Sequence, residues 1–581
     1  MLLSNLDLLA TAPGGVARLR ELILTLAVQG KLVPQDPADE PASVLLQKTR
    51  AEKDRLIAEG KIRRDKPLAE IAEGEKPFEV PEGWEWTSLA TIGVINPRND
   101  APDETLASFV QMSSIPVEFS AAHVSEPRPW KDIKSGFTQF AEGDVGVAKI
   151  TPCFENGKST VFQNLSNGIG AGTTELHIVR PLGGIERRYV LLFLKTPAFL
   201  KDGEAVMTGS AGQKRLPRSY FEGKPFPLPP LAEQSRIVTR VEELMRLCDA
   251  LEAKGRLEAA QHAQLVSTLL GTLTASATPE ELADHWQRVA QHFDLLLDRP
   301  AAIDALEQTL LQLAVRGLLV PQDPTDEPAS VLLARIRTEK DRLIAAGQIK
   351  RDKPLPPITD EEKPFELPVG WEWVRMGAVV NASEAGWSPT CIGSPRRPGL
   401  WGVLKVSAVS WGEFDANANK ELPSDLVPRP EYEVRDGDFL LSRANTAELV
   451  ARSVVVEQAE PKLMLSDKII RLAVSSQMNR SFLNMANNAS YAREHYAVNA
   501  SGTSSSMKNV SREVVLALPV PLPPLAEQSR IVTRVTALRR LCADLRQRLA
   551  ERQSVQARLA EALVANNAQT STQQEDECHA A

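Results

Sequence analysis

One fifteen-residue segment occurs twice in this chain. PLPPLAEQSRIVTRV occupies residues 227–241 and, letter for letter, residues 521–535, which is 294 positions later. A second repeat runs at an offset of 287, because residues 19–86 match residues 306–373 from the LAVQG/LAVRG helix and the VPQDP turn to the GWEW motif. The stretches between the repeats do not align beyond scattered local similarities. The sequence therefore predicts a duplicated scaffold that carries two different inserts.

Each copy of PLPPLAEQ leads into a helix, since proline is tolerated in a first helical turn. The apolar residues that follow step by four and three, which is typical of a coiled-coil seam, although a helix packed on a globular core would also show it. The residues predicted to form this scaffold or partner interface are Ile237, Val241, Leu244, Leu251, Ile531, Val535, Leu538 and Leu545. Cys248 and Cys542 share the stripe and are interpreted as small buried hydrophobic residues.

The order of the repeats constrains the architecture. The middle of the chain carries a long helix, a break near Thr278-Pro279, an amphipathic helix and a further helix that restarts at Pro300. The N-terminus carries only the counterpart of that last helix, and the C-terminus only the counterpart of the long one. We predict an α+β fold with internal duplication and pseudo-twofold symmetry, in which long antiparallel, coiled-coil-like helices separate two globular α+β domains.

The same repeats predict the domain boundaries. These are an N-terminal scaffold helix and arm (1–83), a first insert (84–228), a central helical spacer with the repeated arm (229–370), a second insert (371–522), a C-terminal scaffold helix (523–566) and a disordered tail (567–581).

Composition fits a soluble protein of several domains, with 581 residues, 43% of them hydrophobic. The first fifteen residues do not have the pattern of a signal peptide, and no apolar run reaches the roughly 20 residues of a membrane span. We therefore expect a cytoplasmic protein with no membrane contact. The five cysteines are scattered without metal spacing, so we expect no metal site. The net charge of −8 is unusual for a nucleic-acid binder, and it has to be examined by segment.

Both inserts are interpreted as strands, then one helix, then a Gly/Ser loop with basic residues, then a final strand. The helical runs are RRYVLLFLKTPAFL in the first insert and RSFLNMANNASYAREHY in the second. The later part of each insert is basic, since residues 145–224 hold eleven Lys/Arg against six acids and residues 440–512 hold nine against five. Such loops can bring cations and backbone amides to phosphates, although a merely solvated basic face would look the same.

The common catalytic and cofactor motifs are missing. ENGKST at 155–160 lacks the first glycine of a phosphate-binding loop, because Pro152 stands in its place and no convincing helix follows. NPRN at 96–99 is not the Asn-Pro-Pro-aromatic motif of amino-methylating enzymes, and neither histidine ligand spacing nor GxSxG occurs. The sequence therefore indicates a protein without catalytic activity or cofactors of its own.

The doubled PLPPLAEQ-x-RIV helix, the KPFE-[VL]-P-x-GWEW segments and ILTLAVQGKLVPQDP resemble the scaffold of type I restriction-modification specificity subunits. GDVGVAKITPCFENGK with GAGTTELHIVRP is similar to one class of target-recognition domain, and GDFLLSRANTAELV with SGTSSSMKN to another. The resemblance covers nearly the whole chain.

This resemblance implies a non-catalytic subunit that reads double-stranded DNA. Each insert would be a target-recognition domain that reads one half of an asymmetric, bipartite target. The subunit would bind two methyltransferase subunits and recruit restriction/translocase subunits. The assembled complex would be an adenine-N6 methyltransferase and ATP-dependent endonuclease. S-adenosylmethionine, ATP and Mg would belong to the partner subunits.

Candidate DNA-binding residues follow from motif position. In the first insert they are Lys149, Lys158, Gln213, Lys214 and Arg215, and in the second Arg443, Asn445, Ser504, Ser505, Ser506 and Lys508. Arginine and lysine can bind guanine, and asparagine or glutamine adenine, but phosphate contacts or structural roles remain open for each. The twin tryptophans of the GWEW motifs are interpreted as domain-packing anchors rather than base-stacking platforms. The alternative function is a structural adaptor whose two inserts bind proteins.

Overall fold

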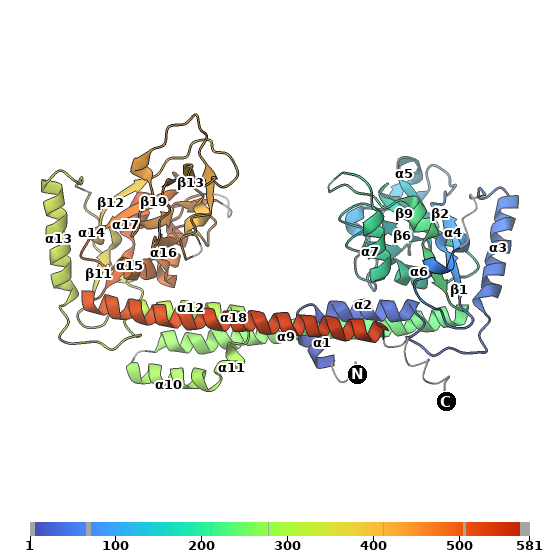
Figure 1. Cartoon of the computed structure of the whole chain (residues 1–581), viewed down its shortest axis with the longest axis horizontal. Helices are drawn as coiled ribbons and strands as arrows, with labels where there is room; N and C mark the ends of the chain where they lie inside the picture. Colours follow the sequence, from blue (N-terminus) through green and yellow to red (C-terminus); the bar gives the residue numbers. More distant parts are fainter. Residues whose placement is uncertain are drawn as a thin grey trace. The chain divides into compact units, whose positions relative to one another are not determined.

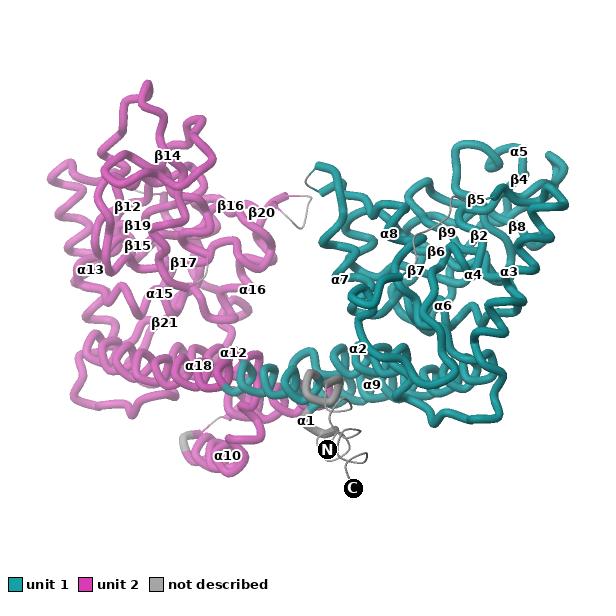
Figure 2. The backbone as a smooth tube through the Cα atoms, turned by 45° about the vertical axis from the view of Figure 1, so that its right-hand side comes forward, with its two compact units in different colours: residues 1–259, 552–581 teal, residues 260–551 magenta. Residues whose placement is uncertain are grey.

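The computed structural model describes residues 6–64, 71–210, 212–276, 278–351, 353–410, 412–502 and 507–569. The chain divides into two compact units, residues 1–259 with 552–581 (unit 1) and residues 260–551 (unit 2), as coloured in Figure 2. Two helices of 45 residues, α9 (Leu231–Ala275) and α18 (Leu525–Gln569), each begin in one unit and end in the other. Each unit therefore contains one insert, the first part of one long helix and the last part of the other.

Unit 1 combines helices and sheets (Figure 1). Besides α9, its helices are α1 (Leu6–Thr11), α2 (Gly15–Val28), α3 (Ala42–Ala58), α4 (Leu89–Ile92), α5 (Trp130–Ile133), α6 (Arg187–Leu194), α7 (Pro197–Val206) and α8 (Arg218–Gly223). Its strands are β1 (Glu85–Ser88), β2 (Gly93–Ile95), β3 (Leu106–Val110), β4 (Glu126–Pro129), β5 (Thr138–Ala141), β6 (Val145–Ala148), β7 (Ser159–Val161), β8 (Ile169–Gly172), β9 (Leu176–Pro181) and β10 (Pro225–Leu228).

Unit 2 has a corresponding set of elements. Its helices are α10 (Pro279–Gln291), α11 (Phe293–Leu296), α12 (Pro300–Val315), α13 (Ala329–Ala345), α14 (Met376–Val379), α15 (Arg480–Asn488), α16 (Ser490–Asn499), α17 (Arg512–Ala517) and most of α18. Its strands are β11 (Glu372–Arg375), β12 (Val380–Ala385), β13 (Gly402–Leu404), β14 (Asn419–Glu421), β15 (Phe439–Ser442), β16 (Ala444–Asn445), β17 (Ser453–Val455), β18 (Leu463–Met464), β19 (Ile469–Val474), β20 (Lys508–Asn509) and β21 (Pro519–Leu522).

Each insert contains a central four-stranded sheet, and the two sheets have the same strand arrangement although the sequences of the inserts do not align. In unit 1 the strand order is β2-β9-β6-β7, and in unit 2 it is β12-β19-β15-β17, with antiparallel neighbours throughout. In both inserts the first and last strands also pair, as β1 with β10 and β11 with β21. The outer sheets differ, because β4-β3-β8-β5 has four strands and β14-β13-β18 has three. The α+β class and the duplicated organisation are thus confirmed.

The helical part of each insert differs from the single helix predicted. In unit 1 the run breaks into α6 and α7, because Thr196 caps α7 by accepting a hydrogen bond from the backbone N–H of Phe199 and Pro197 occupies the first turn. In unit 2 it breaks into α15 and α16 at Ala489. A further short helix, α8 or α17, precedes the final strand in each insert.

The breaks predicted around the central helices are confirmed. Helix α9 ends at Ala275, and the Thr278 hydroxyl caps α10 by accepting a hydrogen bond of 3.2 Å from the backbone N–H of Glu281. Helix α12 begins at Pro300, as expected. Among the described residues, no helix is both long enough and apolar enough to cross a bilayer.

The predicted apolar stripe is used for packing inside each unit. Ile237 and Val241 of α9 are completely buried against α2 and the first insert. Ile531 and Val535 of α18 are buried against α12 and the second insert. The partly buried stripe residues Leu244, Leu251, Leu538 and Leu545 continue these contacts. The seam therefore serves the scaffold, and it also buries Cys248 and Cys542 as predicted.

Candidate nucleic-acid interface

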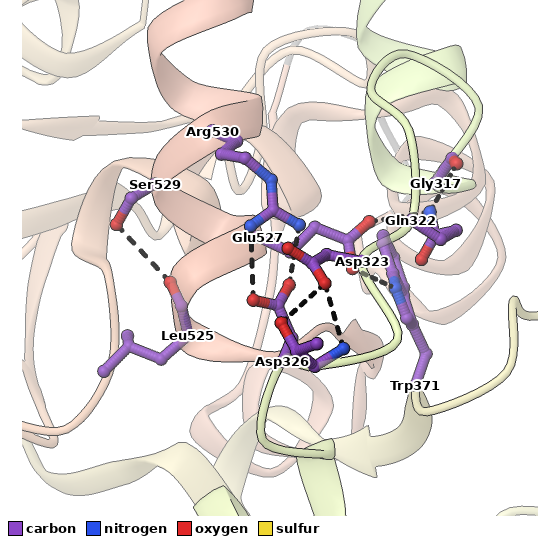
Figure 3. Close-up of polar contacts among 10 residues, drawn as sticks. Gly317, Gln322, Asp323, Asp326, Trp371, Leu525, Glu527, Ser529 and Arg530 are labelled. Atoms are coloured by element: carbon purple, nitrogen blue, oxygen red, sulfur yellow. Dashed lines mark hydrogen bonds and ion pairs between the residues drawn. The ribbon is translucent and has the colours of Figure 1, made fainter.

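A buried glutamate anchors each insert to its long helix. Glu527, at the start of α18, accepts hydrogen bonds from the Trp371 Nε1–H at 2.9 Å and from the Gln322 Nε2–H at 2.7 Å (Figure 3). Next to it, Arg530 pairs with Asp326 at 2.6 Å. Burial raises the pKa of Glu527, and the hydrogen bond from Trp371 opposes this shift. The carboxylate thus ties the arm, the insert and the helix together.

Unit 1 repeats this anchor residue for residue. Glu233 accepts hydrogen bonds from Trp84 at 2.9 Å and from Gln35 at 2.6 Å, and Arg236 pairs with Asp39 at 2.6 Å. Trp84 and Trp371 are 5% and 6% exposed, so they cannot offer a ring face to a base. The interpretation as packing anchors is confirmed for Trp84 and Trp371, the first tryptophan of each pair.

In the first insert, a basic hairpin lies against the end of the central strand β6. Thr208 and Arg215 close the hairpin through backbone hydrogen bonds of 3.1 and 2.8 Å. The hairpin is fastened to the segment after β6, because the Leu216 N–H donates to the Lys149 carbonyl at 2.7 Å and the Thr151 N–H to the Lys214 carbonyl at 3.0 Å. The structure therefore brings four predicted residues together, namely Lys149, Gln213, Lys214 and Arg215.

The second insert builds the same arrangement from different residues. Its hairpin is closed between Ser501 and Asn509, and it pairs with the segment after the central strand β15. The Val510 N–H donates to the Arg443 carbonyl at 3.0 Å, just as Leu216 donates to Lys149. Lys149 and Arg443 are thus structurally equivalent, and each is the cation that follows the central strand. Sequence comparison of the inserts missed this, although Gly-Asp directly precedes both strands at the same 294-residue offset.

Several candidate side chains already have partners inside the chain. Lys158 donates to the Met112 carbonyl at 2.9 Å, and Lys508 to the Gly502 carbonyl at 2.6 Å. The Asn445 amide donates to the Ser410 hydroxyl at 2.8 Å and accepts from the Thr446 N–H. These contacts give the three side chains structural roles within their own inserts. Ser504, Ser505 and Ser506 lie outside the described residues.

The remaining cations differ in how they are held. Arg215 is exposed and forms a forked ion pair with Glu175, with bonds of 2.8 and 3.0 Å. This hydrogen bonding is the main cause of the lowered pKa of Glu175. Glu175 is a site residue that sequence reasoning overlooked, because it had been counted only as an acid. Arg443 is exposed and its guanidinium makes no hydrogen bond or ion pair with the described residues, so it is available to a phosphate or a base edge.

The long helices expose a second repeated feature. Leu247 and Leu541, at matched positions of α9 and α18, are 60% and 59% exposed, and the matched pair Leu265 and Leu559 are 51% and 49% exposed. Within each helix the two leucines are 18 residues apart, which is five full turns, so they lie on one face. This exposed face is separate from the buried stripe and is presented once on each long helix.

Comparison with known proteins agrees with the resemblance. No family model matches the chain. The specificity subunit of the type I restriction enzyme EcoEI of Escherichia coli is 49% identical over 553 residues, which cover 94% of this chain and 93% of that protein. The specificity subunit of the EcoAI enzyme, also of Escherichia coli, is 45% identical over 564 residues with the same coverage.

A solved chain from a study of complex assembly and conformational transition in the type I R-M system superimposes with a TM-score of 0.49 and 18% identity. This match covers 85% of this chain and 99% of that chain. The matches to both curated relatives cover nearly the whole of this chain and nearly the whole of each relative, at high identity. The chain therefore belongs to the family of type I restriction enzyme specificity subunits.

Proposed function

We propose that this specificity subunit reads a bipartite, asymmetric target in double-stranded DNA, one half with each insert. The observation that carries the proposal is the repeated basic hairpin. Two inserts of unlike sequence dock such a hairpin beside an equivalent cation, Lys149 in one and Arg443 in the other. Different side chains on a common frame are what two half-sites of different sequence require.

Exchange of a whole insert tests this proposal. Replacement of residues 84–228 by the insert of a relative with another target should change one half of the methylated sequence and leave the other half intact. Sequencing of methylated adenines in a host that carries the partner subunits gives the readout. A change in both halves would contradict the assignment of one half-site to each insert.

Single substitutions test the two equivalent cations. Arg443→Ala should weaken binding or relax specificity at the half-site read by the second insert, and Lys149→Ala should do so at the other half-site. A base contact predicts an effect of about 1–3 kcal/mol confined to one position, and a phosphate contact predicts a uniform loss with a lower salt slope. Binding to duplexes that carry single base changes distinguishes these outcomes.

The proposal extends to the partner subunits. The matched exposed leucines on α9 and α18 would each receive one copy of the same partner, so the chain would bind two methyltransferase subunits. That complex would recruit restriction/translocase subunits, and the S-adenosylmethionine, ATP and Mg would be held by the partners. The assembly would then methylate adenine in both half-sites and cleave DNA in an ATP-dependent reaction.

The partner assignment has its own test. Leu247→Arg and Leu541→Arg should each leave a complex with one methyltransferase subunit, and the double variant should leave none. Native mass spectrometry of the purified complex counts the subunits. Loss of both partners from either single variant would show that the two faces do not act separately.

The alternative function considered for the sequence is a protein-binding adaptor. It predicts that the isolated chain binds DNA weakly and with a shallow dependence on salt, because few phosphates would be neutralised. A salt-titrated binding assay with duplex DNA separates the two candidates.

A further inference from the structure

Each unit carries a basic arm beside its insert. We define arm 1 as residues 42–64 and arm 2 as residues 329–351; they consist of α3 or α13 and the turn that follows. Arm 1 has seven Lys/Arg against three acids, and arm 2 has six against two, so each carries +4 in a chain whose net charge is −8. Figure 1 shows α13 beside β11 and β12 of the same unit.

One lysine fastens each arm to its insert. Lys340 of α13 donates to the carbonyls of Gly377 and Val380, both at 2.9 Å. Lys53 of α3 donates to the carbonyls of Ala90 and Gly93 at matched places. The charge of these two lysines is therefore used to attach the arm.

A groove of 1240 Å³ runs between arm 2 and the second insert. Seven basic side chains and three acidic ones are among the described residues that line it. Arg337, Lys350 and Arg351 lie on its rim and are exposed. Their side chains make no hydrogen bond or ion pair with any residue that the structure describes. The rim therefore presents positive charge that the fold itself does not neutralise.

We infer that arm 2 contacts the phosphate backbone of duplex DNA, outside the bases that the second insert reads. This inference rests on the proposed function and adds a second, sequence-independent contact to it. Duplex DNA is favoured over an acidic protein segment because the free cations stand on the exposed rim, where long lysine and arginine side chains reach phosphates. The same basic turn recurs in arm 1 beside the other insert, where Arg63 and Arg64 are exposed at the positions matched to Lys350 and Arg351.

The test is a salt titration with the full-length chain. In the variant Arg337→Gln/Lys350→Gln/Arg351→Gln, the slope of log K against log salt should become shallower by about 2–3, since each phosphate contact contributes about 0.9. Affinity should fall by the same factor for random duplex DNA and for a duplex with the methylated target, which leaves the specificity ratio unchanged. An unchanged slope would overturn the inference.

Matched variants separate the arm from net charge and from folding. Arg246→Gln/Lys254→Gln/Arg256→Gln removes the same charge from exposed positions of α9 and should leave the slope nearly unchanged. Arg337→Lys/Lys350→Arg/Arg351→Lys keeps the charge and should retain the slope of the unmodified chain. If the charge-removing arm variant keeps its DNA slope but loses a partner subunit, the groove binds an acidic protein segment and the inference is wrong.

The two proposals fail in different ways. If the unmodified chain binds DNA without a steep salt slope or without preference for the methylated target, the proposed function fails. If the unmodified chain does both and the arm variant behaves identically, only the role of the arm fails.

Discussion

The two units join insert to helix with the same residues, but they differ inside the inserts and where the helices pair. The anchors around Glu233 and Glu527 agree to within 0.1 Å in both tryptophan and glutamine bonds. By contrast, the buried Lys195 at the end of α6 is matched by Asn488 at the end of α15. The junction is fixed by one set of contacts, whereas the interior of each insert follows its own sequence.

The ion pairs between the scaffold helices differ in another way. The short helix carries the arginine in unit 1, whereas the long helix carries it in unit 2. In unit 1, Arg20 of α2 pairs with Asp249 and Glu252 of α9 at 2.6 and 2.7 Å. In unit 2, Arg546 of α18 pairs with Asp304 and Glu307 of α12 at 2.6 and 2.9 Å. Arg20 and Glu307 occupy matched positions of the repeat, and so do Glu252 and Arg546.

This reversal distinguishes two helices that begin identically. If α2 paired with α18, Arg20 would face Arg546, and if α12 paired with α9, Glu307 would face Glu252. The identical fifteen residues cannot prevent such mispairing, whereas like charges oppose it. The junction is therefore the same in both halves, whereas the residues that distinguish the two long helices lie a few turns further along each helix.

The largest effect is expected from loss of an anchor. Trp84→Ala and Trp371→Ala should each destabilise their own unit by about 3–5 kcal/mol, because a buried ring is lost and a buried carboxylate loses a donor. Hydrogen exchange read by mass spectrometry assigns the loss to one unit. Unequal losses would show that the two anchors are not energetically equivalent.

The interiors of the inserts should differ in their response to pH. Lys195 donates to the carbonyls of Val117 and Gly157 at 2.7 and 3.0 Å, and burial lowers its pKa to about 7. Between pH 7 and the ordinary lysine pKa, the unfolded state binds the proton and the folded state does not. Stability of the first insert should therefore rise with pH across this window, by at most about 1.4 kcal/mol per pH unit.

The second insert gives an internal control, because its matched residue is the neutral Asn488, which donates to the Ser453 carbonyl at 2.9 Å. Hydrogen exchange corrected for intrinsic rates should show the rise in the first insert only. Lys195→Met should abolish it. An equal rise in both inserts would mean that Lys195 is not its source.

The scaffold could be predicted from the sequence because its features are local and repeated. Helix breaks at Thr278 and Pro300, the buried stripe through Ile237 and Ile531 and the tryptophan anchors all have strong sequence signals. The similar central sheets of the two inserts had only a weak sequence signal, because many different apolar residues can form a buried strand. Only the Gly-Asp before each central strand marked the correspondence.

The candidate site was predicted in position but not in detail. The basic hairpins lie where the Gly/Ser loops were expected, and Lys149 lies with Lys214 and Arg215. The sequence could not show that the side chains of Lys158 and Asn445 donate hydrogen bonds within the chain, because their acceptors are far away in the sequence. Tertiary contacts of this kind decide which polar side chains remain free to bind a ligand.

A smaller effect is expected from the reversed ion pairs. Arg20→Glu should destabilise unit 1 by about 1 kcal/mol, because it replaces a partly exposed ion pair by repulsion from Asp249 and Glu252. Adding Glu252→Arg should restore most of the loss. In unit 2 the matched cycle is Arg546→Glu with Glu307→Arg. Denaturant unfolding gives the coupling energy of each cycle. A double variant no more stable than the single one would show that these ion pairs do not distinguish the two helices.

The smallest effect concerns an ion pair that only unit 2 has. Arg375 binds Glu362 at 2.7 Å, and this bond lowers the pKa of Glu362 to about 2, whereas the position matched to Arg375 is Ser88 in unit 1. The stabilisation is present above the ordinary glutamate pKa and is lost as pH falls from about 4.5 to about 2. Acid should therefore loosen the turn that carries Glu362, just before the second insert, earlier than the matched turn of unit 1. Arg375→Ser should remove the difference, which hydrogen exchange of these two turns would reveal; if the difference persisted, the acid sensitivity would have to come from another group.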